Sequence, residues 1–175
     1  MASAFGHAVA AIGLGSVFQK HLRMPKFWVL GIVCSIIPDA DVIGFQYEIP
    51  YESFWGHRGF SHSILFAGLF GIFIAYLFYK SQRPLLSLYF FICILSHGIL
   101  DGMTSGGRGV AYFSPFENSR HFLPWRPIKV SPIGAKNFFS EWGLQVLESE
   151  AIWIGIPILV FTSIIYILKS TFLSK

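Results

Sequence analysis

The sequence predicts an all-α integral membrane protein that folds as one bundle of about five helices. Hydrophobic residues make up 54% of its 175 residues and charged residues only 13%, whereas about 25% of the residues in an ordinary soluble domain are charged. Long apolar stretches alternate with short segments that contain Lys, Arg, Pro or Gly. The acidic residues and most of the histidines concentrate near one end of these stretches. We therefore interpret residues 1–175 as a single membrane-embedded domain.

Five apolar stretches define the expected helices. Spanning the hydrocarbon core of a bilayer takes about 20 residues, with a range of about 17 to 25. The last three stretches meet this length. The first is short and the second contains Pro38, Asp39 and Asp41, so we expect these two to span only in part. Cys34 and Cys93 lie inside apolar stretches, where we expect buried thiols rather than a disulfide. The stretches are residues 4–18, 27–45, 63–79, 85–103 and 151–168.

The basic residues predict an orientation. Cytoplasmic segments of membrane proteins carry an excess of Lys and Arg, and basic residues follow the first, third and fifth stretches. This bias places the amino terminus and all nine acidic residues outside, although six other basic residues also lie there. The basic residues are scattered, so no nucleic-acid partner is expected. We expect a bacterial inner membrane protein whose cytoplasmic basic residues are Lys20, Arg23, Lys26, Lys80, Arg83, Lys169 and Lys175.

The ionisable residues of these stretches are expected to converge. Adjacent helices run antiparallel, so residues that open one helix lie beside residues that close the next. Several of them lie about 12 residues, or roughly 18 Å, from the opposite edge of the bundle. Ionisable groups inside a membrane mark a functional site by default. The residues that share one end of the bundle are His7, Asp39, Asp41, His62, His97 and Asp101.

Five of these residues have simpler explanations. His97 and Asp101 are four residues apart, so a helix places them on one face. They could bind zinc, manganese or iron, or form a structural contact. His7 alone could hydrogen-bond a neighbouring helix. Asp39 or Asp41 could cap the next segment instead of binding a metal.

Residues 55–63, with the sequence WGHRGFSHS, form the most specific local motif. Two histidines, an arginine and two hydroxyls surround a glycine just before an apolar helix. The simpler explanation is a loop with Ser61 or Ser63 as the helix N-cap. Capping is compatible with metal binding by His57 and His62, and we expect both.

Together, these motifs resemble a known family. PDAD at residues 38–41, HRGFSHS at 57–63 and SHGILD at 96–101, with His7 near the start, are similar to the YdjM-type membrane-bound metal-dependent hydrolases over roughly residues 1–130. That family is in turn similar to the zinc-dependent phospholipase C and P1 nuclease fold, whose His-x-x-x-Asp helix supplies metal ligands.

The resemblance implies a metal site with fewer ions than those enzymes contain. They complete a three-zinc cluster with a later His-x-x-x-Glu pair, and this sequence has none. One or two divalent ions are therefore expected, most simply zinc, with manganese or iron as alternatives. The expected ligands are His7, Asp39, Asp41, His57, His62, His97 and Asp101.

The connection at residues 104–150 is expected to lie outside the membrane and could form a lid. Its arginines at positions Arg108, Arg120 and Arg126 alternate with aromatic residues, and they could bind substrate or anchor the chain at the membrane interface. Arg58 could pair with an aspartate of the PDAD motif or bind a phosphate through its planar donors. Residues 137–149 carry a helical apolar stripe, which either lies on the membrane surface or extends the last helix.

The favoured function is metal-dependent hydrolysis of a phosphoester. A bound metal would activate water, Asp39 or Asp41 would accept its proton, and Arg58 would stabilise the developing charge. The resemblance implies a phosphoester, and the burial of the site implies a membrane lipid such as a phospholipid or a polyprenyl phosphate. The alternatives are a metal-binding carrier or transporter and a non-catalytic scaffold stabilised by metal.

Overall fold

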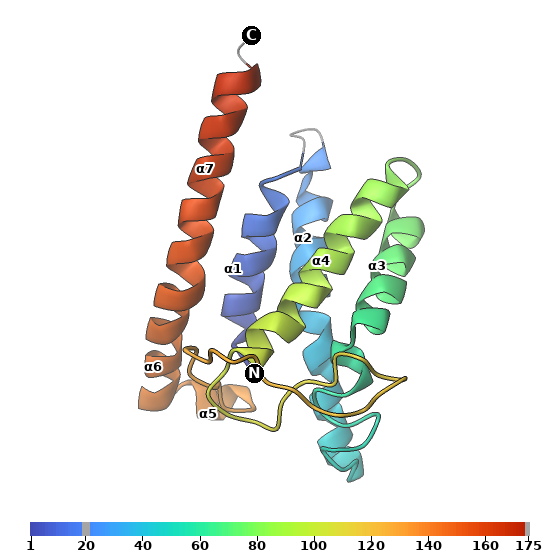
Figure 1. Cartoon of the computed structure of the whole chain (residues 1–175), viewed down its shortest axis with the longest axis vertical. Helices are drawn as coiled ribbons and strands as arrows, with labels where there is room; N and C mark the ends of the chain where they lie inside the picture. The colour runs from blue at the N-terminus through green and yellow to red at the C-terminus, as the bar shows by residue number, and fades with distance from the viewer. Residues whose placement is uncertain (19–21, 174–175) are drawn as a thin grey trace.

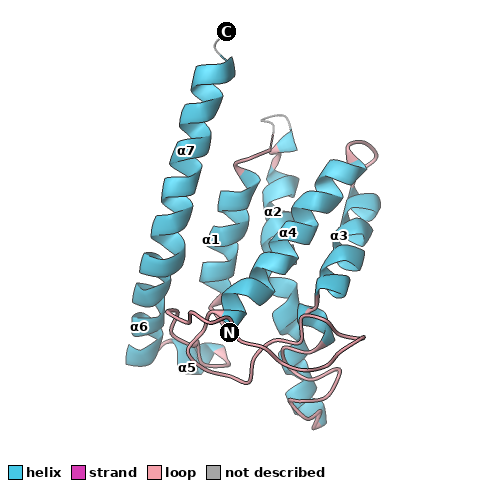
Figure 2. Cartoon of the chain, in the orientation of Figure 1, coloured by secondary structure: helices cyan, strands magenta, loops and turns pink. Residues whose placement is uncertain are grey.

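The computed structural model describes residues 1–18 and 22–173. Its helices lie side by side, and within the described ranges no residue belongs to a β-strand (Figure 2). Lys20 and Lys175, two of the predicted cytoplasmic residues, lie outside these ranges. The elements are α1 (Ala4–Gly15), α2 (Pro25–Ile36), the 3₁₀ helices Ile37–Tyr47 and Phe60–His62, α3 (Ile64–Phe78), α4 (Arg83–Gly102), α5 (Ala135–Phe138), α6 (Glu141–Glu150), the π-helical turn Ala151–Gly155 and α7 (Ile156–Leu173).

Helix α4 is the centre of the bundle. It packs against α1, α2 and α3, and α7 lies along the outer side of α1 (Figure 1). The buried face of α4 carries Tyr89, Phe90 and Cys93 in its apolar half, and His97 and Asp101 near its carboxyl end. Because α4 touches three other helices, it brings their polar ends to one place.

An aromatic core fills the end of the bundle opposite the amino terminus. The rings of Phe27 and Tyr89 stack with centroids 4.1 Å apart, and Phe18 meets Tyr89 edge-on. Cys34 and Cys93 are both buried and free, as predicted. This half of the described bundle therefore holds apolar packing.

The second stretch is longer than predicted. Helix α2 continues without a break into the 3₁₀ helix, and together they form an apolar segment of 23 residues, Pro25–Tyr47, that is long enough to cross a membrane. Pro38 lacks an N–H donor and therefore cannot continue the α-helical bonding pattern. The chain stays helical beyond the proline, so this stretch is long enough for a full crossing, where we expected a partial one.

Helix α3 is shorter than predicted, and the last helix takes the longer of its two predicted forms. Helix α3 has only 15 residues, fewer than the predicted span, because the chain becomes extended at Tyr79. Its N-cap is Ser63, one of the two predicted caps, which accepts a hydrogen bond from the N–H of Phe66. The stripe at residues 137–149 extends the last helix, since α6 runs through the π-helical turn into α7 and gives an apolar segment, Glu141–Thr171. The helix that is separate from this segment, α5, has only four residues.

One end of the bundle carries the long connections. The amino terminus, the segment at 48–59 and the long connection at 103–134 all lie at one end of the bundle (Figure 1). The long connection is tied to this end, because Ala111 donates a backbone hydrogen bond to Arg58 and the N–H of Ile64 donates to Tyr112. The end that carries the predicted polar residues is therefore covered by ordered loops.

Candidate metal centre

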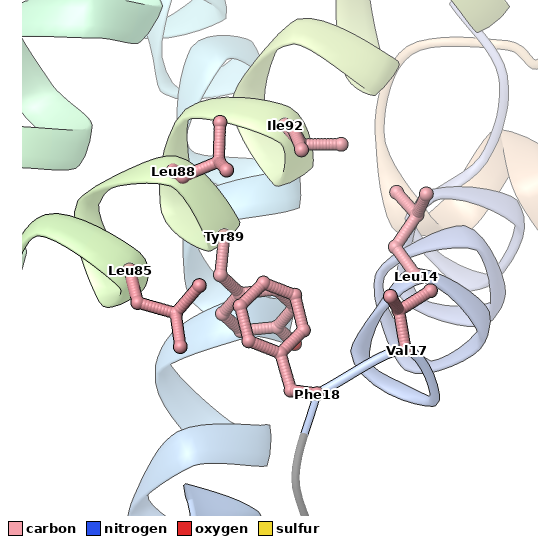
Figure 3. Close-up of a pocket in the computed structure, with 7 residues that line it drawn as sticks. All are labelled: Leu14, Val17, Phe18, Leu85, Leu88, Tyr89 and Ile92. Carbon is pink, nitrogen blue, oxygen red and sulfur yellow. The ribbon is translucent and has the colours of Figure 1, made fainter. Parts of the chain in front are cut away.

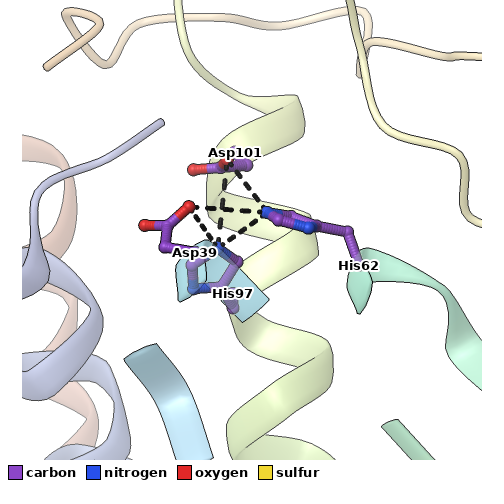
Figure 4. Close-up of side chains that lie close together, drawn as sticks. All are labelled: Asp39, His62, His97 and Asp101. Carbon is purple, nitrogen blue, oxygen red and sulfur yellow. Dashed lines mark hydrogen bonds and ion pairs between the residues drawn. The ribbon is translucent and has the colours of Figure 1, made fainter. Parts of the chain in front are cut away.

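Four buried side chains meet where the helices end. Each offers one ligand atom, and these atoms lie within 4.8 Å of one another (Figure 4). The four residues are Asp39 of the 3₁₀ segment, His62 just before α3, and His97 and Asp101 of α4. We call these residues the four-residue group. Asp39 is 8% exposed, and the other three are almost completely buried.

The spacing of the four-residue group suits a single ion. His97 Nε2 lies 3.0 Å from His62 Nε2 and 3.3 Å from Asp39 Oδ1. His62 Nε2 lies 3.6 Å from Asp39 Oδ1 and 3.7 Å from Asp101 Oδ2. Ligands bound to zinc at about 2.0–2.2 Å in a tetrahedron are roughly 3.3–3.6 Å apart. The group could therefore hold a tetrahedral divalent ion.

Both imidazoles are oriented toward the centre of the group by their other nitrogen atom. His97 Nδ1 lies 2.7 Å from the backbone carbonyl oxygen of Ser35, which can only accept a hydrogen bond. His62 Nδ1 lies 2.9 Å from Ser61 Oγ, whose own proton goes to Asp41 Oδ2, and 3.2 Å from that same carboxylate oxygen. With Nδ1 as the donor, each Nε2 faces the group and can bind an ion once it is deprotonated, which is the usual arrangement of metal-binding histidines.

Two carboxylate oxygens of the group, Asp39 Oδ1 and Asp101 Oδ2, are buried without a hydrogen-bond partner among the described residues, and only the second has the Arg58 guanidinium beside it. Asp39 Oδ1 points between His62 and His97 (Figure 4). Buried polar atoms almost always have a partner. A cation bound by the group would satisfy Asp39 Oδ1, so the residues present fit a metal ion.

A second group shares His62. Asp41, His57 and His62 also bring ligand atoms within 4.8 Å of one another. Asp41 Oδ1 lies 2.6 Å from His57 Nδ1, and its Oδ2 accepts hydrogen bonds from the Arg58 N–H at 3.0 Å and from Ser61 Oγ at 2.6 Å. Asp41 thus fixes the HRGFSHS motif, whether or not the three-residue group binds an ion.

The geometry of the 3₁₀ segment explains why Asp39 and Asp41 have different partners. With about three residues per turn, positions two apart point in directions roughly 120° apart. Asp39 therefore faces His97, and Asp41 faces His57. Neither aspartate caps the next helix, because both lie inside the segment Ile37–Tyr47.

His7 lies beside the four-residue group rather than within it. Its ring stacks on that of His97 with centroids 3.8 Å apart, and its Nε2 lies 3.5 Å from Asp101 Oδ1. Its two ring nitrogens lack hydrogen-bond partners among the described residues. Of the seven predicted ligands, six thus fall in the two groups that share His62, and His7 contacts them.

Arg58 has a different partner from the one predicted. Its Nε lies 2.9 Å from Asp101 Oδ2, whereas we expected Asp39 or Asp41. Its other nitrogens donate to the Gly106 carbonyl at 3.1 Å and to Thr104 Oγ1 at 3.0 Å, and the side chain is fully buried. These contacts use the planar donors that a substrate phosphate would need, so Arg58 balances the charge of Asp101 instead.

The three loop arginines lie outside the four-residue group. Arg120 donates to the backbone carbonyls of His57 and Tyr51, and so holds the segment that carries His57. Arg108 forms an exposed ion pair with Glu52. Arg126 lies over the ring of Phe122, 4.5 Å from its centroid. A role in substrate binding stays a prediction for these three.

Several contacts of the site have no signal in the sequence. The backbone N–H of Ala2 donates to Asp101 Oδ1 at 2.7 Å. Glu150, buried where α6 ends, accepts hydrogen bonds from the N–H and the hydroxyl of Ser3 and so fixes the start of α1. Backbone donors belong to every residue, so sequence reasoning could not select Ala2. For Glu150, the sequence shows only that a glutamate directly precedes the last apolar stretch, and this does not reveal its contact with Ser3.

Metal binding at this site should depend on pH. Burial opposes protonation of His62, but the carboxylates of Asp101, Asp39 and Asp41 outweigh it and raise the pKa to about 10. The folded protein therefore keeps this proton at pH 7, and a metal ion must displace it. We expect the apparent zinc affinity to increase up to about tenfold per pH unit below pH 10. Competition with a chromogenic chelator between pH 6 and 8 measures this slope, and a flat profile would contradict the assignment of His62 as a ligand.

Comparison with known proteins extends the resemblance over the whole chain. The sequence model of a family described as "YdjM inner membrane protein" matches residues 1–172. The chain is also similar to an Escherichia coli (strain K12) protein, "Inner membrane protein YbcI", with 33% identity over 160 residues, which cover 90% of this chain and 92% of that protein. No solved structure shows a significant match. Both descriptions name an inner membrane, and neither names a reaction.

Proposed function

Because the chain belongs to the YdjM inner membrane protein family, we propose that it is an integral inner membrane hydrolase that cleaves a phosphoester bond of a membrane lipid with the help of a bound divalent metal. The observation that carries this proposal is the four-residue group, in which two imidazole nitrogens and two carboxylate oxygens converge at ligand spacing. Zinc suits such a tetrahedral set of nitrogen and oxygen ligands best. The positive-inside bias would place the site toward the outer face of the membrane.

The charges near the site support a divalent ion. Asp39, Asp41 and Asp101 carry three negative charges, and the Arg58 guanidinium, 2.9 Å from Asp101, provides one positive charge. Buried charge is costly unless it is compensated. Once His62 has lost its proton, two further positive charges would balance these four residues, which matches one zinc, manganese or iron(II) ion.

The residues of the site divide the chemical work. Asp39, His62, His97 and Asp101 would hold the ion, which when bound lowers the pKa of a water molecule toward about 7 and polarises a phosphoryl oxygen. Asp41 lies outside this set and is thus the spare carboxylate that can accept the proton of the attacking water. Its Oδ1 contacts His57 Nδ1, so His57 can share the proton with it. Arg58 keeps Asp101 in place through its ion pair.

The substrate is proposed to be a lipid because the site is set at the end of apolar spans. Phospholipids and polyprenyl phosphates carry their phosphoester at this level of a bilayer. A carrier function is less consistent with the bundle, because the described core beyond the site is apolar and includes Phe27, Cys34 and Phe90. Ionisable groups along the path are typical of ion-conducting proteins.

Metal removal and substrate hydrolysis test the proposal together. Detergent-purified protein is expected to contain about one or two zinc ions and to release phosphate or a phosphorylated headgroup from a phospholipid or a polyprenyl phosphate. Chelation should abolish turnover, and added zinc should restore it. Circular dichroism should show the helices intact after chelation, whereas a metal-stabilised scaffold would lose them. A metal-loaded protein that cleaves none of these lipids would contradict the enzyme function.

A further inference from the structure

The two histidines of the four-residue group are supported unequally by the fold. His97 lies on α4, the central helix, and Tyr89, earlier on the same helix, packs edge-on against Phe18 with ring centroids 4.9 Å apart (Figure 3). His62 lies on the short 3₁₀ helix Phe60–His62, between a loop and α3. Side chains on long packed helices are held more precisely than side chains on loops. His62 therefore depends more than His97 on the partners of its ring.

The partner of the second ring nitrogen also differs between the two histidines. His97 Nδ1 contacts the backbone carbonyl oxygen of Ser35, which can only accept a hydrogen bond. His62 Nδ1 lies 2.9 Å from the Oγ of Ser61, the preceding residue in the chain. A hydroxyl can donate or accept, so the contact with Ser61 does not by itself decide which nitrogen of His62 carries a proton.

Asp41 fixes the direction of the Ser61 hydroxyl. Ser61 Oγ lies 2.6 Å from Asp41 Oδ2, a distance typical of a hydroxyl that donates to an ionised carboxylate. A hydroxyl has one proton and a carboxylate can only accept, so Ser61 donates to Asp41 and offers a lone pair to the N–H of His62 Nδ1. Asp41 is itself held by the Arg58 N–H at 3.0 Å and by His57 Nδ1 at 2.6 Å. The hydrogen bonds therefore run in one direction, from His62 through Ser61 to Asp41.

The direct contact between His62 and Asp41 is the weaker of the two. His62 Nδ1 lies 3.2 Å from Asp41 Oδ2, whereas charge-assisted hydrogen bonds between N–H and carboxylate groups are usually about 2.7–2.9 Å long. Removal of the Ser61 hydroxyl would leave the ring nitrogen with this longer contact. It would also remove one of the donors that hold Asp41 in place, so the orientation of the His62 ring depends on Ser61.

We propose that Ser61 is a positioning residue of the metal centre, and that its hydroxyl, directed by Asp41, holds the His62 ring with Nε2 toward the other ligands. This inference rests on the metal centre of the proposed function. His62 Nε2 lies 3.0 Å from His97 Nε2 and 3.6 Å from Asp39 Oδ1, and Figure 4 shows the ring pointing into the group. Hydrogen-bond partners of metal-binding histidines typically change metal affinity or activity by about 10–100-fold.

Three variants separate this function of Ser61 from a general loss of structure. Ser61→Ala removes the hydroxyl, and Ser61→Thr retains it. Ser96→Ala is the matched control: Ser96 directly precedes His97, as Ser61 precedes His62, but its Oγ donates to a backbone carbonyl of its own helix at 2.8 Å. Ser63 stays unchanged in all three variants, because it is the N-cap of α3. A loss that is specific to Ser61→Ala therefore reports the hydroxyl beside His62.

The test measures the zinc affinity of each variant in detergent, by competition with a chelator, and the visible spectrum of the cobalt(II)-loaded protein, which reports the arrangement of the ligands. Ser61→Ala should weaken zinc binding by about tenfold or more and alter the cobalt spectrum, whereas Ser61→Thr and Ser96→Ala should stay within about threefold of the wild type and keep its spectrum. A Ser61→Ala variant that matches Ser96→Ala in both measurements would overturn the inference. So would a Ser61→Thr variant that is as impaired as Ser61→Ala.

A measurement on the wild-type protein tests the inference even if Ser61→Ala fails to fold. The long-range proton–nitrogen correlation spectrum of the zinc-loaded protein should show that His62 carries its proton on Nδ1 and the metal on Nε2. Zinc on Nδ1 of His62 would overturn the inference and leave the metal centre standing. A wild-type protein that binds no zinc would overturn both. A zinc-loaded protein that cleaves no lipid would contradict the proposed reaction alone.

Discussion

Replacing His97 with alanine is expected to remove the metal and abolish turnover. His97 Nε2 lies within 3.3 Å of ligand atoms of both His62 and Asp39, so alanine leaves the four-residue group one ligand short. Bound metal contributes several kcal/mol to stabilising the transition state, which corresponds to a loss on the order of a thousandfold in rate. Elemental analysis and the hydrolysis rate measure the two effects.

His121→Ala is the matched control for this variant. His121 lies on the long connection, its side chain is 47% exposed, and its nearest acidic partner is Glu117. Its removal should leave metal and activity unchanged. Asp101→Asn should behave like His97→Ala, since an amide is a poor ligand, although it retains an acceptor for the Ala2 N–H. Full metal content in both His97→Ala and Asp101→Asn would show that α4 does not supply the ligands.

Replacing Arg58 with methionine is expected to cause the largest loss of stability. The guanidinium is fully buried, pairs with Asp101 and donates to Gly106 and Thr104. Removal of one partner of a buried ion pair costs about 3–5 kcal/mol, because the other charge stays buried. In a chain of this size the unfolding temperature should fall by roughly 6–20 °C, measured in detergent by circular dichroism.

Arg126→Met provides the comparison for Arg58→Met. Arg126 is exposed and lies over Phe122, a contact worth about 0.5–1 kcal/mol. Adding Asp101→Asn to Arg58→Met should cost less than the two separate losses combined, because the double variant no longer buries an unpaired charge. If Arg58→Met unfolded at the same temperature as Arg126→Met, the pair with Asp101 would not stabilise the fold.

The contacts of Arg58 show where sequence reasoning reached its limit. A buried guanidinium beside several carboxylates was predictable from the HRGFSHS and PDAD motifs. The choice of Asp101 over Asp39 or Asp41 depends on a backbone with φ of 61° at Arg58 and on the carbonyl of Gly106, 48 residues further along the chain. No local pattern contains that information.

The sequence by itself determined the helical membrane class, the position of the polar residues at one end of the bundle, and the shared face of His97 and Asp101. These follow from composition, from the antiparallel order of adjacent helices, and from the 3.6-residue period, which are all local properties. Only the tertiary structure divided the predicted ligands into two groups that share His62 and placed His7 beside them. It also buried all four members of the four-residue group, of which Asp39, at 8% exposure, is the most exposed. The physical reason is that these outcomes depend on how α2, α4 and the loop before α3 pack, and such packing joins residues far apart in the chain.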